Sequence, residues 1–68
     1  MNEEAFNISV RKFLKHFGVS AQREIELAVR RGLEDGSIRD DQPIPVRATL
    51  TVGDKIHDFH IDSELTLR

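Results

Sequence analysis

Apolar residues in the first quarter of the chain recur every three or four positions, the spacing of one face of an α-helix. These positions are Phe6, Val10, Phe13 and Phe17. Asn2 precedes them as a helix-capping residue, and Gly18 follows them as a residue that commonly ends a helix. The pattern predicts a first helix over residues 2–17.

A second stretch with helical spacing lies between Ser20, a good N-cap residue, and Gly36, a good C-cap residue. Its apolar stripe is narrow and consists largely of small residues: Ala21, Ile25, Ala28, Val29, Gly32 and Leu33. We predict a second helix over residues 21–35. The short joint at Gly18 and Val19 would turn it back on the first helix as an angled or antiparallel pair.

From residue 46 onward the apolar period changes to two, as in a half-buried strand. Residues 37–45 contain two prolines and are predicted to be a linker, anchored in the core by Ile38. Gly53-Asp54 fits a two-residue turn, which predicts a hairpin over residues 46–67. The pairs expected across it are Val52 with Lys55, Leu50 with His57, Ala48 with Phe59, and Val46 with Ile61.

Each predicted element has one apolar face, and four such faces can form one core. The expected fold is a single α+β domain over residues 1–68, with two helices followed by an antiparallel β-hairpin packed on the helix pair. The expected core residues are Phe6, Val10, Phe13, Phe17, Ile25, Val29, Leu33, Val46, Leu50, Phe59 and Ile61.

Length and composition bear on stability and on partners. A chain of 68 residues buries only about 60% of its unfolded surface, and this one has no cysteine for a disulfide or a thiolate metal site. A homodimer or an unknown protein partner is therefore the expected source of extra stability. The net charge of −2 does not favour nucleic acid or a membrane surface. The sequence contains no apolar run of membrane-spanning length and no signal peptide, so a cytoplasmic location is expected.

No residue pattern points to catalysis, to a cofactor or to a small-molecule ligand. The sequence has no cysteine nucleophile, no serine in a nucleophile elbow and no glycine-rich phosphate loop. Asp58, His60 and Asp62 share one strand face and could hold a divalent ion weakly, but a solvated face is the ordinary interpretation. We therefore expect a protein that is not an enzyme and holds no metal.

The order of turn, helix and hairpin resembles a winged helix-turn-helix, beginning at Phe17-Gly18-Val19-Ser20. The resemblance is incomplete, because Glu24 occupies the place where that motif has an apolar residue. Acidic residues also oppose the arginines of the would-be recognition helix, and phosphate binding depends on unopposed cations. A winged-helix-like nucleic-acid-binding protein is therefore the alternative function.

Surplus apolar residues indicate a protein-binding surface instead, although single exposed apolar residues are ordinary. Two lie on the helix faces opposite the predicted core, and two lie in the last residues, where the second strand outruns the first. The segment 63–67 either pairs with a second chain or folds back beside residues 40–42. The candidate partner-binding residues are Ile8, Arg23, Leu27, Arg30, Leu65 and Leu67.

Several segments together resemble a family of short bacterial proteins of unknown function. They are Met1-Asn2-Glu3-Glu4-Ala5-Phe6-Asn7, Arg11-Lys12-Phe13-Leu14-Lys15, Gly18-Val19, Gln22-Arg23-Glu24-Ile25-Glu26, Thr49-Leu50-Thr51 and Glu64-Leu65. The resemblance implies a stand-alone bacterial domain and brings no activity, cofactor or site residue with it. With the surplus apolar surface, the function expected is a protein-interaction or self-associating module.

Overall fold

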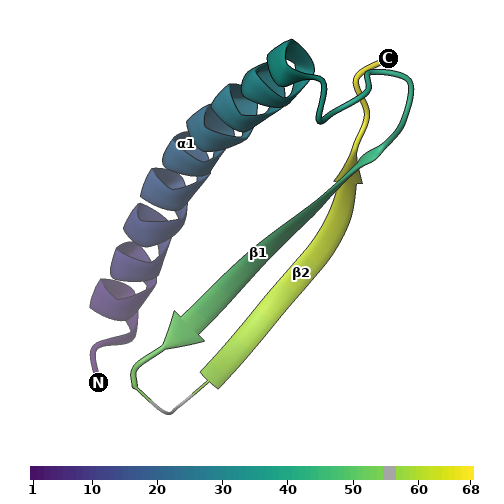
Figure 1. The fold of residues 1–68 in the computed structure, drawn as a ribbon. Helices are drawn as coiled ribbons and strands as arrows, with labels where there is room; N and C mark the ends of the chain where they lie inside the picture. The colour runs from purple at the N-terminus through teal and green to yellow at the C-terminus, as the bar shows by residue number, and fades with distance from the viewer. Residues whose placement is uncertain (55–56) are drawn as a thin grey trace.

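The fold is one long helix followed by a two-stranded antiparallel hairpin, as seen in a computed structural model (Figure 1). The structure describes residues 1–54 and 57–68, with only the backbone of His57. Helix α1 spans Glu3–Asp35, strand β1 spans Ile44–Val52, and strand β2 spans His57–Leu65. The protein is therefore α+β, as expected, but the predicted pair of helices is wrong.

Helix α1 continues without a break through Gly18, where the sequence predicted a turn. Gly18 does not adopt the left-handed conformation, because glycine permits that conformation without requiring it. A break there would leave the backbone groups of two new helix ends without partners. The apolar positions Phe17, Ala21 and Ile25 also follow each other at intervals of four, so one stripe runs across the supposed joint.

Both outer ends of the helix lie where the sequence predicted them. The side chain of Asn2 accepts a hydrogen bond from the amide of Ala5 at 3.0 Å, which caps the first turn. Gly36 ends the helix with φ 82° and ψ 4°, the left-handed conformation that other residues rarely adopt. Ser20, predicted as an N-cap, lies inside the helix instead.

The loop after α1 is fastened back onto the last turns of the helix. The amide of Ile38 donates to the carbonyl of Gly32 at 3.0 Å, and the side chain of Ile38 lies directly on Gly32. A Cβ atom at residue 32 would come within 2.5 Å of Ile38 Cγ1. Gly32 is buried and Ile38 is half-buried, so Ile38 does anchor the linker, against the helix backbone.

The hairpin pairs two residues out of the predicted register. Val52 pairs with His57, Leu50 with Phe59 and Ala48 with Ile61. Four residues therefore separate the strands, and the predicted two-residue turn pairing Val52 with Lys55 is wrong; Lys55 and Ile56 lie outside the described residues. A shift of two keeps every side chain on its predicted face, because strand side chains alternate with period two.

The predicted overhang of the second strand is also wrong. Strand β1 begins at Ile44, and Leu65 pairs with it. Pro45 is accommodated inside β1 because both strands of a two-stranded sheet have an outer edge where no amide is needed. The last three residues fold back beside the linker, where Arg68 donates to Asp40 at 3.2 Å. Residues 63–65 thus pair with β1, and only the residues after them follow the fold-back alternative.

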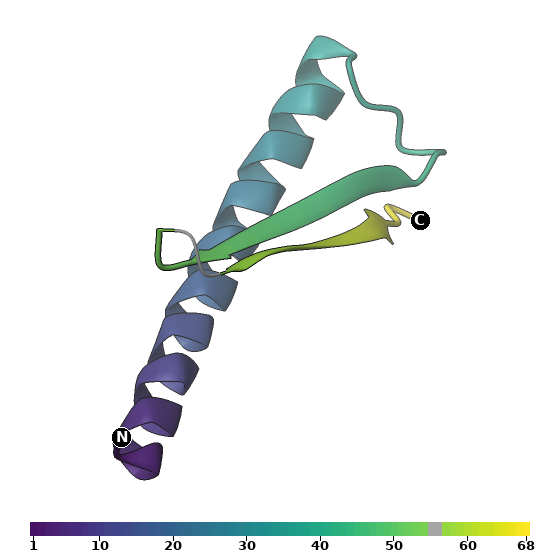
Figure 2. The same cartoon turned by 90° about the horizontal axis from the view of Figure 1, so that it is seen from below.

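The helix and the hairpin form two layers that cross obliquely. Figure 1 shows them side by side, and Figure 2 shows the hairpin passing the middle of α1 while the N-terminal turns project beyond it. In the described residues, no Cα atom of α1 lies within 8 Å of a Cα atom of either strand. The molecule is elongated, with extents of 50 × 22 × 18 Å. None of its described helical residues form a segment apolar and long enough to cross a membrane.

The two helical glycines provide a matched test of the single helix. A Cβ at Gly18 meets nothing within 4 Å, so Gly18→Ala should raise the free energy of unfolding by about 0.5–1 kcal/mol. A Cβ at Gly32 overlaps Ile38, so Gly32→Ala should be at least about 1 kcal/mol less stable than Gly18→Ala. Urea unfolding followed by circular dichroism measures both. Destabilisation by Gly18→Ala would restore the two-helix interpretation, because alanine is disfavoured in a left-handed turn.

The helix C-terminus provides a pH-dependent test. The Asp35 carboxylate accepts hydrogen bonds from the hydroxyl of Ser37 and from the Ser37 backbone amide, whose nitrogen lies 2.9 Å from Asp35 Oδ1. Both bonds hold the pKa of Asp35 below its ordinary value, and the hydroxyl has the larger effect. The stability from this contact is present above the unfolded-state pKa and is lost as the pH falls through the lower folded-state pKa. Ser37→Ala should move the Asp35 pKa upward, measured by NMR titration of its carboxyl carbon. An unchanged pKa would contradict the role assigned to the hydroxyl.

Candidate interaction surface

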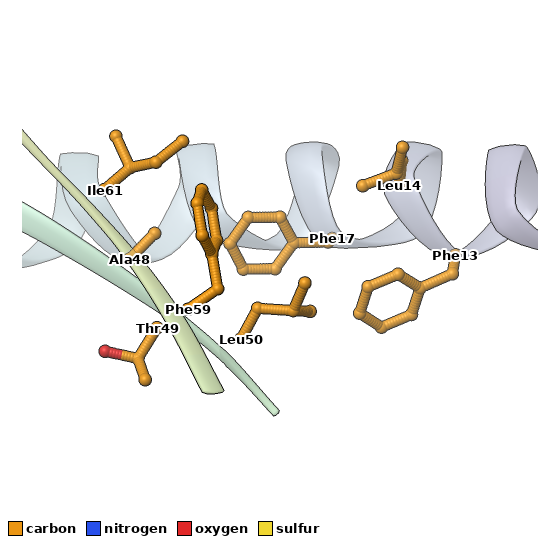
Figure 3. Close-up of a pocket in the computed structure, with 8 residues that line it drawn as sticks. All are labelled: Phe13, Leu14, Phe17, Ala48, Thr49, Leu50, Phe59 and Ile61. Atoms are coloured by element: carbon orange, nitrogen blue, oxygen red, sulfur yellow. The ribbon is translucent and has the colours of Figure 1, made fainter. Parts of the chain in front are cut away.

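An apolar cleft of about 210 Å³ lies between the N-terminal half of α1 and the hairpin. Phe17 and Phe59 lie ring beside ring at its centre, with Leu50 below them, and Thr49 turns its side chain away from the helix (Figure 3). The rings of Phe13 and Phe17 stack with centroids 6.3 Å apart and planes 14° apart. The residues that line it are Phe13, Leu14, Phe17, Ala48, Thr49, Leu50, Phe59 and Ile61.

A second, wider cleft of about 500 Å³ continues from the first toward the C-terminal half of α1. It shares Phe17, Ala48 and Thr49 with the first cleft, and we refer to the two together as the groove. The small side chain of Ala21 leaves space in its wall, while Glu24 and Arg47 are its charged residues. The further lining residues are Ser20, Ala21, Glu24, Ile25, Val46 and Arg47.

The groove is open, and the predicted core is not buried. Phe13 is 53% exposed and Ile61 is 56% exposed, and no apolar side chain in the described residues is fully buried. Ile25, Val29, Val46 and Leu50 are half-buried at best. The faces were assigned correctly, but one helix crossing a hairpin covers less apolar surface than the expected helix pair would.

The whole chain is less compact than a stable monomer of its size. Its accessible surface is 6332 Å², whereas a compact monomer of this mass exposes about 4,400 Å². Its radius of gyration is 15.9 Å, against about 11 Å for a compact domain of this length. About 1,900 Å² of surface that a globular chain would bury is therefore exposed.

The residues predicted to bind a partner from the helix lie away from the groove. Arg23, Leu27 and Arg30 follow each other at helical spacing on one stripe of α1, and none of them lines a cleft described above. Ile8, which is 45% exposed, also lies outside the groove. The structure brings none of these four together with the groove, and their role stays a prediction.

The two C-terminal candidates have partners within the chain. Leu65 is half-buried in the ladder opposite Ile44, and Leu67 is half-buried beside residues 40–43. The unpaired overhang expected at these leucines is therefore absent, because Leu65 pairs with β1 and Leu67 lies beside the loop. The sequence did not identify Leu14, Ala21 and Ala48 as groove residues. The unbroken spacing of four from Phe17 through Ala21 to Ile25 could have indicated Ala21.

The winged-helix alternative loses its structural basis. It required a turn at Gly18 between two helices, and α1 passes through that residue as a single helix. Arg23 and Arg30 are exposed on this helix, and so are Glu26 and Glu34.

The outer face of the hairpin is polar and ion-paired. The guanidinium of Arg47 donates to both carboxylate oxygens of Asp62, at 2.5 and 3.2 Å, and His60 Nε2 lies 3.6 Å from Asp62. Within residues 1–54 and 57–68, no three acidic or histidine side chains are placed to hold a metal ion. The side chains of Arg47, His60 and Asp62 are all exposed, so the face has the character of a solvated strand surface.

Comparison with known proteins adds a family and no activity. No curated protein and no solved structure matches the chain. A family model described as "Family of unknown function (DUF6494)" matches residues 1–68. The chain therefore belongs to DUF6494, a family of unknown function, over its whole length.

Proposed function

We propose that this chain is a non-enzymatic protein-interaction module whose groove is covered by another polypeptide. The observation that carries the proposal is the accessible surface of 6332 Å², about 1,900 Å² more than a compact monomer of this mass exposes. A bacterial origin and a cytoplasmic location, expected from the sequence, belong to the same proposal.

The energetics favour a fold that depends on its partner. Burying one large apolar side chain contributes about 1.5–3 kcal/mol, and small domains have a total stability of only about 5 kcal/mol. An isolated two-stranded hairpin is itself marginal in water. Phe13, Leu14 and Ile61 are each about half exposed, so covering all three would contribute about 2–4 kcal/mol, a large part of what the whole domain needs.

The shape of the groove fits a polypeptide better than a small molecule. It follows α1 from Phe13 to Ile25, a helix length of about 18 Å. Small-molecule sites enclose most of their ligand and place a few polar groups around it. This groove is open along its length, and its charged residues, Glu24 and Arg47, both belong to its wider end.

Small-angle X-ray scattering tests the proposal on the intact chain. We expect either a monomer as extended as the structure, with a radius of gyration near 15.9 Å, or a larger assembly. A monomer with a radius of gyration of about 11 Å would overturn the proposal, because the helix and hairpin would then have closed on each other without a partner.

A pair of substitutions tests the groove itself. In the assembled protein Phe17→Ala should lower the free energy of unfolding by about 3–5 kcal/mol, because Phe17 lines both parts of the groove. Val19→Ala is the control: Val19 is 67% exposed and lies outside the groove, so its effect should stay within about 0.5 kcal/mol. Equal effects in urea unfolding would contradict a covered groove.

A further inference from the structure

We propose that the polypeptide covering the groove is a second copy of this chain, related to the first by a two-fold axis. The helices run antiparallel, and the N-terminal turns of each helix lie over the groove of the other. This inference rests on the proposed function and names its partner.

The chain carries two apolar surfaces that complement each other. One is the concave groove. The other is a ridge formed by the exposed side chains of Phe6 and Val10 near the N-terminus of α1. The N-terminal turns of the helix project beyond the hairpin (Figure 2). Phe6 is 50% exposed, and neither residue lines the groove. A two-fold interface requires such self-complementarity, since each surface of one copy meets the other surface of its partner.

The size of the exposed surface matches a permanent dimer. An excess of about 1,900 Å² per chain amounts to about 3,800 Å² for two chains, within the range of about 2,000–5,000 Å² for obligate homodimers. Specific complexes of standard size bury about 1,200–2,000 Å² in total, and weak transient ones bury less. The groove and ridge together therefore suit a partner that stays bound.

The spacing of side chains along α1 sets the register. With the axis between Phe13 and Leu14, the antiparallel arrangement places Phe6 opposite Ala21 and Val10 opposite Phe17. All of these residues lie on one side of the helix. The large ring of Phe6 thus meets the small Ala21, where the wider part of the groove has room.

Sedimentation equilibrium with two matched variants tests the dimer. Phe6→Lys places a charge on the ridge, outside the chain's own groove, and should weaken dimerisation at least about a hundredfold, because each dimer contains two copies of the change. Ile8→Lys makes the same change two residues away on another side of the helix and should alter the dissociation constant by less than about threefold.

The outcomes separate this inference from the proposed function. An extended monomer at every concentration up to millimolar would overturn the homodimer and leave a different protein partner. A compact monomer would overturn both. A dimer weakened by Ile8→Lys and not by Phe6→Lys would overturn the ridge and assign the interface to the back of the helix.

Spin-label distances test the arrangement without disturbing the groove. The chain has no cysteine, so Lys15→Cys and Glu26→Cys can each carry a single label at an exposed position outside the groove. In the antiparallel dimer the offset of the two labels along the helix axis is about 33 Å larger at position 26 than at position 15, so the measured separation should be clearly longer at position 26. Equal separations at the two positions would indicate parallel helices and overturn the arrangement.

Discussion

The helix is longer than the hairpin that packs against it, and the open shape of the molecule depends on this mismatch. The 33 residues of α1 form a rod of about 50 Å, while strands of nine residues extend about 30 Å. Because the hairpin also crosses the rod obliquely (Figure 2), it covers the middle of α1 and leaves the N-terminal turns bare. No placement of this hairpin could cover the whole apolar stripe.

The contact between the layers is apolar in character. Each ion pair in the described residues lies within the hairpin or joins parts of the loop and tail, and none connects α1 to a strand. Salt weakens exposed ion pairs, so the angle between the layers should depend little on ionic strength. Apolar attraction weakens on cooling, and the contact between α1 and the hairpin should weaken with it.

The sequence predicted the local features and missed the ones that depend on distant parts of the chain. The caps at Asn2 and Gly36 and the alternation of the strand faces follow from neighbouring residues, and all are present. Gly18 was ambiguous because glycine accepts helical and left-handed conformations alike. The strand register was ambiguous because a slip of two residues preserves the apolar face.

The groove could be predicted only in part, for the same reason. The apolar face of each element was readable from the sequence, so half of the residues that line the groove appeared in the predicted core. Whether these residues would be enclosed depended on the number of helices. The predicted number of helices in turn depended on the conformation of Gly18 alone. Once α1 is continuous, the same side chains form an open wall.

The contact of Ile38 with Gly32 is the point from which the hairpin extends, so it acts as a pivot between the hairpin and α1. This joint fixes the loop at the C-terminal end of α1, while the far end of the hairpin lies a full strand length away (Figure 1). A rotation of about 10° at the pivot moves the tip of a strand about 30 Å long through about 5 Å. A change in how Ile38 packs on Gly32 would therefore alter the width of the groove most at the end far from this contact.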